Sequence, residues 1–177
     1  MASKLEKFSK KYGFFTSEAS SEEIVAISKE LSDVMYDHTR VLSKNAITML
    51  GISIVSIIFG LFLLTQVQII SGSWKTIVLF IRIAAIAMFI TSAIAAYLAV
   101  ASAEKGASFT PMMWRNVRES ASDERVYEQM LATKKINKQI FTARNYVKSS
   151  ALFIIIGAFL IGTVFLIQRL VEAGYLT

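Results

Sequence analysis

Few side chains in this sequence could take part in catalysis or bind a metal. There is one histidine, His38, and no cysteine, so no cluster supplies the ligands that zinc, haem or iron requires. The sequence has no glycine-rich phosphate loop, no pair of catalytic acids and no serine nucleophile motif. We therefore expect a protein without enzymatic activity, cofactor or metal site. His38 could bind a metal only where copies of the chain meet, and we interpret it as an interface residue.

Arg82 is the residue most in need of a partner, because it is a charge inside an apolar stretch. No acid occurs between Asp37 and Glu104. If the last apolar stretch runs antiparallel to the one that holds Arg82, Glu172 lies at about the right level for an intramembrane contact. Gln66 and Gln68 are polar alternatives. Two other interpretations are that Arg82 reaches the outer headgroups or lines a pore.

Three lysines near the end of the inner loop could bind phosphate. Lys134, Lys135 and Lys138 follow a group of acids on the same predicted helix. We expect them to contact lipid headgroups or a phosphate-bearing ligand, and we expect no nucleic acid polymer as a partner. The alternative is a solvated helix face that also sets the orientation of the chain.

Three apolar stretches must position these residues. They cover Ala46 to Ile70, Thr76 to Val100 and Ser149 to Val171, and each exceeds the roughly 20 residues that cross a hydrocarbon core about 30 Å thick. Hydrophobic residues make up 54% of the chain and charged residues 18%, as expected where lipid is the main solvent. The sequence predicts an all-α integral membrane protein with three transmembrane helices.

Lysine and arginine lie mostly on one side of these spans. Seven precede the first span and nine lie between the second and third, while the outer turn holds only Lys75 and the end of the third span only Arg169. The positive-inside rule therefore predicts a multi-pass protein of the cell membrane with a cytoplasmic N-terminus and an outer C-terminus. The predicted segments are cytoplasmic amphipathic helices over 1–45, a transmembrane hairpin over 46–101, a basic cytoplasmic helical loop over 102–148, the third span over 149–171 and an outer tail over 172–177.

The first cytoplasmic helix has a clear start. Ser20 and Glu23 form a capping box, from which a helix can run unbroken into the first span. Apolar residues then recur at alternating spacings of three and four, as in the seam of a coiled coil. An ordinary amphipathic helix packed on the rest of the cytoplasmic part explains the spacing equally well. The candidate seam residues are Ile27, Leu31, Val34 and His38.

The inner loop has two helix-start signals. Thr110 and Pro111 resemble a cap followed by a first-turn proline, and Ser120 with Asp123 offers a second start. From the second start the helical period continues without proline or glycine until Gly157. The simplest expectation is a short helix followed by one of about 45 residues, half cytoplasmic and half membrane-spanning.

Small residues spaced four apart predict close helix packing inside the membrane, where backbone approach is a main source of attraction. The pattern does not say whether the helices pack within one chain or between copies. These residues are Ala87, Thr91, Ala95 and Ala99 in the second span, Ser56 and Gly60 in the first, and Ala158 and Gly162 in the third.

Two segments are predicted polar helices that enter the first and third spans, namely DHTRVLSKNAITMLG and ERVYEQMLATKKINKQIFTARNYVKSSALFIIIG. With these segments, the layout from Tyr36 to Gln168 resembles the small transmembrane effectors of bacterial nucleotide-signalled antiphage systems, namely the Pycsar effector proteins and, more loosely, the two-span SLATT effectors. The resemblance implies an oligomer whose cytoplasmic helices sense a signal and whose spans then permeabilise or depolarise the membrane. No nucleotide-binding motif matches residue by residue, so no site residue is carried over.

Two functions fit these features. One is an oligomeric membrane effector or pore-type protein, built from copies of this chain by helical assembly in the lipid bilayer. The other is an accessory structural subunit of a larger membrane complex, such as a respiratory or other redox assembly, whose other subunits hold the cofactors. The candidate seam favours self-association, whereas Arg82 without an acid in its own or the first span favours a partner chain.

Overall fold

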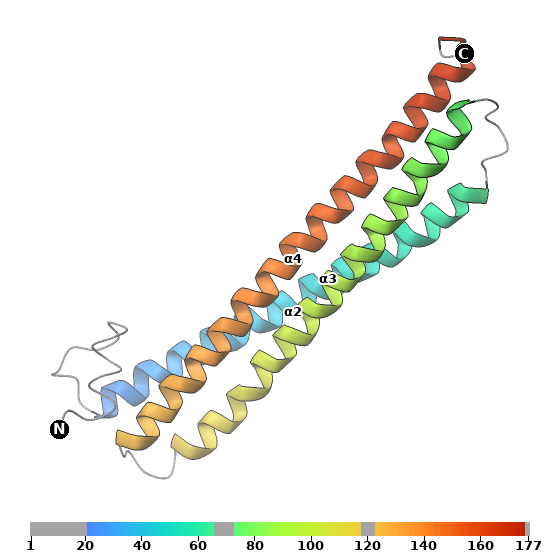
Figure 1. The fold of residues 1–177 in the computed structure, drawn as a ribbon. Helices are drawn as coiled ribbons and strands as arrows, with labels where there is room; N and C mark the ends of the chain where they lie inside the picture. Colours follow the sequence, from blue (N-terminus) through green and yellow to red (C-terminus); the bar gives the residue numbers. More distant parts are fainter. Residues whose placement is uncertain (1–20, 66–72, 118–122, 176–177) are drawn as a thin grey trace. The chain divides into compact units, whose positions relative to one another are not determined.

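The described part of the protein consists of three long helices. The computed structural model describes the backbone of residues 21–65, 73–117 and 123–175, and the side chains of residues 33–65, 74–107, 131 and 133–175. The helices are α2 (Ser21–Thr65), α3 (Ser73–Val117) and α4 (Asp123–Glu172) (Figure 1). Each contains a stretch long and apolar enough to cross a membrane, within Asp33–Thr65, Trp74–Ala107 and Thr133–Glu172. The predicted all-α class with three candidate membrane spans is therefore confirmed.

The helix boundaries follow most of the sequence signals. α2 begins directly after the predicted cap Ser20, and α4 begins at Asp123 and runs for 50 residues into the third span. The expected separate helix after Thr110 is not formed, because α3 continues through Pro111 to Val117. Proline fixes φ near the helical value, but inside a helix it removes one backbone hydrogen bond and its ring crowds the carbonyl group four residues earlier.

The chain divides into two compact units. One, called the span unit below, contains residues 44–100 and 144–177; the other, the stalk unit, contains residues 1–43 and 101–143. The boundaries fall within a few residues of the ends of the predicted spans. Each helix therefore contributes one part to each unit.

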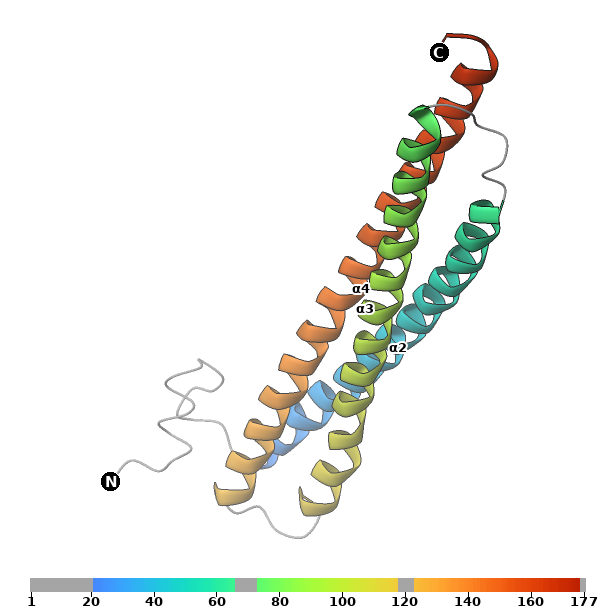
Figure 2. The same cartoon turned by 45° about the vertical axis from the view of Figure 1, so that its right-hand side comes forward.

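The span unit is held by contacts between the parts of α2, α3 and α4 that it contains. α3 runs antiparallel to α2 and α4, and its span part lies beside that of α4 in both views (Figure 1, Figure 2). The core has two apolar clusters with members from different helices. They are Leu63, Ala85, Phe89 and Ile161, and Val78 with Val164, to which Trp74, Ile81 and Ile167 add partly buried side chains.

The described part of the stalk unit has buried residues on all three helices. Thr39 on α2 and Ala103 on α3 are buried, as are Ile136 and Ala143 on α4. A Cβ added at Gly106 would lie 3.2 Å from Cγ2 of Thr39, so α2 and α3 approach closely at this point. The three helices therefore pack together in this unit as well.

Most of the apolar surface of the spans faces outward. In the most apolar 18-residue windows of the three candidate spans, only 17%, 33% and 22% of the residues are buried. Phe80, Ile155 and Phe159 are each more than half exposed. Exposed apolar surface of this extent is unfavourable in water and favourable in hydrocarbon, so the span unit requires a bilayer around it.

α4 ends in a capping motif built by its own residues. The amide of Tyr175 donates to Leu170 O and the amide of Gly174 to Val171 O, both at 3.0 Å. Gly174 has a φ of 74°, the left-handed conformation that glycine adopts without strain. This is a Schellman motif, and it satisfies carbonyl groups that the end of a helix would otherwise leave without donors.

Gly157 allows α3 and α4 to approach closely. A Cβ built at this position would lie 2.5 Å from Cε1 of Phe89 and 2.9 Å from its Cδ1 and Cζ atoms, so the aromatic ring lies against the glycine backbone. Nothing lies within 4 Å of a Cβ built at Gly162, one and a half turns further along α4. The two glycines therefore provide a matched pair for measuring this contact.

Replacing Gly157 by alanine should destabilise the span unit by about 1 to 3 kcal/mol relative to the same change at Gly162, because a buried ring must shift. Both substitutions add one methyl group to α4 and change its helix propensity equally. Reversible unfolding in detergent micelles, followed by circular dichroism, gives the difference. Equal unfolding free energies for G157A and G162A would contradict the packing of Phe89 on α4.

Candidate functional site: buried polar groups of the span unit

Arg82 is buried inside the span unit. Its side chain is 2% exposed, and its Nη1 atom donates a hydrogen bond of 2.6 Å to the carbonyl oxygen of Leu63. Among the described residues, its Nε atom has no hydrogen-bond partner. The guanidinium of α3 thus binds the backbone of α2.

Leu63 O lies in the last turn of α2, where the backbone carbonyl groups need donors from outside the helix. α2 ends at Thr65, and the last four carbonyl groups of a helix have no partner within that helix. Thr65 Oγ1 donates to Phe62 O at 2.6 Å, and Arg82 supplies a donor for the next carbonyl. α2 has no basic residue in its own last turn, so Arg82 also brings a cation to the negative end of the helix dipole. Arg82 therefore acts as a C-terminal cap for α2.

Glu172, which the sequence suggests as the acidic partner of Arg82, contacts another residue. Glu172 lies 3.5 Å from Arg169, one turn back on α4, and both side chains are more than half exposed. The predicted contact between Arg82 and Glu172 is thus replaced by a backbone contact, because α2 ends within reach of the guanidinium. Gln66 and Gln68 lie outside the described residues.

A second polar cluster joins all three helices. Ser53 of α2, Ser92 of α3 and Ser150 of α4 are fully buried. The hydroxyl of Ser92 lies 2.8 Å from the hydroxyls of both other serines, and it is 2.9 Å from Ser150 O. Ser53 Oγ also lies 2.8 Å from Met49 O, to which it can donate. We call these three residues the serine cluster.

The serine cluster has more hydrogen-bond contacts than hydroxyl protons to fill them. Three hydroxyl protons serve four contacts, so at any moment one proton is shared or one contact has none. Oxygen atoms 2.8 Å apart are in hydrogen-bond contact. The cluster therefore joins the three helices of the span unit.

The two polar contacts keep one register between α2 and α3. Ten residues separate Ser53 from Leu63 on α2, and ten separate Arg82 from Ser92 on α3. Because the helices are antiparallel, the two contacts lie about 15 Å apart along both helices. Arg82 and Ser92 thus fix α2 at two levels.

The predicted small-residue positions divide into two groups. Ala95, Ala99 and Gly60 are buried and Ser56 is partly buried, whereas Ala87, Thr91, Ala158 and Gly162 are exposed. Residues four apart advance by 400° on a helix, so a series of four turns by about 120° and leaves the interface. The exposed Thr91 hydroxyl donates to Ala87 O at 2.8 Å, which satisfies it without a neighbouring helix.

The predicted seam faces away from the chain where side chains are described. Val34 is 56% exposed and His38 is exposed, while the side chains of Ile27 and Leu31 lie outside the described residues. α2 instead buries the neighbouring residue Thr39 within the stalk unit. Neither Val34 nor His38 is therefore buried by the described part of the chain.

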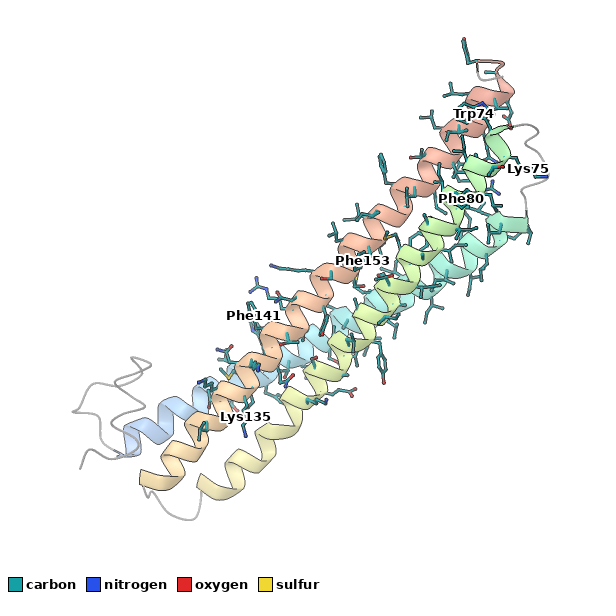
Figure 3. All side chains as sticks on the ribbon, in the orientation of Figure 1. Trp74, Lys75, Phe80, Lys135, Phe141 and Phe153 are labelled. Carbon is teal, nitrogen blue, oxygen red and sulfur yellow. The ribbon has the colours of Figure 1, made fainter. Side chains whose placement is uncertain are left out.

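The predicted phosphate-contact lysines are accessible. Lys134, Lys135 and Lys138 are all exposed on α4. Figure 3 labels Lys135 and, six residues further along the same helix, the exposed Phe141. Figure 3 also shows Trp74 and Lys75 together at the first turns of α3. The serine cluster is the feature that sequence reasoning missed, although each predicted apolar span contains at least one serine, which was a usable signal.

Among the residues that the structure describes, no group of three or more histidine, cysteine, aspartate or glutamate side chains could hold a metal ion. The chain matches no known protein-family model, no curated protein sequence and no solved structure.

Replacing Ser92 by alanine should destabilise the span unit by about 1 to 2 kcal/mol, because it removes the shared partner of two buried hydroxyls. Thr91→Val is the control, since the adjacent Thr91 is exposed and bonds to its own helix. Unfolding in detergent micelles measures both variants. A smaller loss for S92A than for T91V would show that the serine cluster does not hold the helices together.

Replacing Arg82 by leucine should loosen the last turn of α2, because Leu63 O loses its donor. Amide hydrogen exchange of residues 61–65, measured by mass spectrometry in nanodiscs, should become about tenfold faster. Arg82→Lys keeps a donor and should have a smaller effect. Lys75→Leu removes an exposed cation from the same helix and should leave these amides unchanged. Unchanged exchange in R82L would overturn the capping role.

Proposed function

We propose that this chain is a non-enzymatic membrane protein that acts by assembling with copies of itself, as an oligomeric membrane effector or pore-type protein. The observation that carries this proposal is that four small residues with the spacing of helix-packing motifs lie outside the chain's own bundle. They are Ala87, Thr91, Ala158 and Gly162. Small residues on an outer face allow a second helix to approach closely, and lipid has no comparable need for them.

The interior of the span unit supports a function that requires several copies. The serine cluster, with oxygens 2.8 Å apart, closes the centre at one level. The apolar cluster of Phe89, Leu63 and Ile161 fills it at another. A passage for ions would therefore have to form between chains, which is the arrangement that a pore-type effector needs.

The stalk unit also supports self-assembly. Val34 and Val41 of α2 are each 56% exposed, and His38 lies between them on the same helix face. Such a face is suited to a second copy of α2, as the heptad-like spacing predicts. We place this unit in the cytoplasm because most lysines and arginines flank the spans on its side.

The resemblance to the small transmembrane antiphage effectors agrees with self-assembly in its helix order. Lys134, Lys135 and Lys138 would then meet the phosphate of a lipid or of a signal. Arg82 no longer favours a partner chain, because it is buried against Leu63 and an acid from outside could not reach it without repacking.

Cysteine cross-linking tests this proposal well because the chain has no native cysteine. Ala158→Cys and His38→Cys should each give covalent dimers on mild oxidation in native membranes, because both positions would face a second copy. Val55→Cys is the control, since Val55 is 67% exposed on α2 but belongs to none of the predicted packing motifs. The mass of the purified protein, by light scattering corrected for detergent, should be a discrete multiple of 19.7 kDa.

Two results would contradict self-assembly. One is cross-linking of Ala158→Cys no faster than that of Val55→Cys. The other is a monomeric mass together with co-purification, in fixed ratio, of larger membrane proteins in a tagged pull-down. The second result would make the chain an accessory structural subunit of a larger complex, such as a redox assembly.

A further inference from the structure

A band of cations on α2 and α4 lies at the inner end of the span unit. Lys148 lies two residues before Ser150, Arg144 lies six before it, and Lys44 lies nine before Ser53. At the rise of an α-helix these positions are about 3, 9 and 14 Å beyond the serine cluster, on the side away from Arg82. All three side chains are exposed, and among the described residues they form no ion pair.

Two tyrosines lie within the same band. Tyr97, which is 63% exposed, follows Ser92 by five residues, and Tyr146 precedes Ser150 by four. Both are thus about 6 to 8 Å from the serine cluster. At the opposite end, Trp74 lies 23 residues from Tyr97 along α3, or about 35 Å. Aromatic residues separated by about the thickness of a hydrocarbon core mark the two membrane interfaces.

We propose that Lys44, Arg144 and Lys148 form a binding surface for anionic phospholipids, with Tyr97 and Tyr146 at the level of the headgroups. The side chains of lysine and arginine are long enough to converge on one headgroup layer from a band about 11 Å deep. No aspartate or glutamate lies in this band among the described residues, so its positive charge is not offset there. This surface does not depend on whether the chain acts as an effector.

The surface around Lys148 fits a lipid better than a soluble phosphate. Leu152 and Ile155 follow Lys148 at spacings of four and three residues, so the three share one face of α4. Both apolar side chains are more than half exposed. A phospholipid with its phosphate at Lys148 can therefore lay its acyl chains along the same helix face. A free phosphate would leave that apolar surface uncovered.

Native mass spectrometry of the full chain in mild detergent tests this proposal. With equal amounts of phosphatidylglycerol and phosphatidylcholine, the wild-type protein should retain mainly phosphatidylglycerol. The variant R144Q/K148Q should reduce that preference about thirtyfold, because each cation near a charged headgroup contributes about a fivefold preference. R144K/K148R keeps the charges and should keep the preference, which separates loss of charge from loss of fold.

The control is K75Q/R169Q, which removes one lysine and one arginine from the other end of the span unit. This variant should retain phosphatidylglycerol like the wild type. An equal loss of preference in both glutamine variants, or no preference in the wild type, would overturn the proposal. Displacement of the lipid by millimolar glycerol phosphate would also overturn it, because the surface would then recognise a soluble phosphate.

Discussion

Polar groups inside hydrocarbon must be satisfied by the protein itself, and the span unit meets this requirement mainly through α3. Arg82 donates to the end of α2, and Ser92 joins α2 to α4 about 15 Å away. Both contacts hold the same helices in the same register. Apolar packing alone would leave helices free to slide in lipid, because lipid tails are as apolar as leucine side chains. The polar contacts therefore fix the arrangement that the apolar clusters then fill.

Hydroxyl groups in the spans fall into two classes with different consequences. Thr91 and Thr163 donate to carbonyl groups of their own helices, so they can face lipid without a partner. The serine cluster instead shares its hydroxyls between helices. These threonines are thus compatible with an outer surface that lipid or another chain covers. The buried serines, in contrast, hold the three helices together.

The sequence is sufficient to predict the spans, the continuity of α2 and α4 and the general importance of Arg82. It does not predict which face of each span points inward, because lipid-facing residues such as Phe159 are as apolar as core residues such as Phe89. The partner of Arg82 also escapes prediction, since Leu63 O becomes an acceptor only because α2 ends at Thr65. Every residue has a backbone carbonyl group, so the residue type does not indicate which one accepts a hydrogen bond. The serine cluster had a weaker signal in the sequence, because a hydroxyl in a span can bond either to its own helix, as that of Thr91 does, or to a neighbouring helix.

The antiparallel position of α3 gives the span unit an electrical polarity. The peptide dipoles of α3 oppose those of α2 and α4, so an odd number of spans leaves the dipole of about one helix uncancelled. Its positive end lies where α2 and α4 begin, at Ser21 and Asp123, which are 23 and 25 residues before Lys44 and Lys148. In a membrane with a negative interior, half an elementary charge across the whole field corresponds to at most about 1 kcal/mol per 100 mV. The backbone thus favours the same orientation as the lysines and arginines, and it does so at any state of side-chain ionisation.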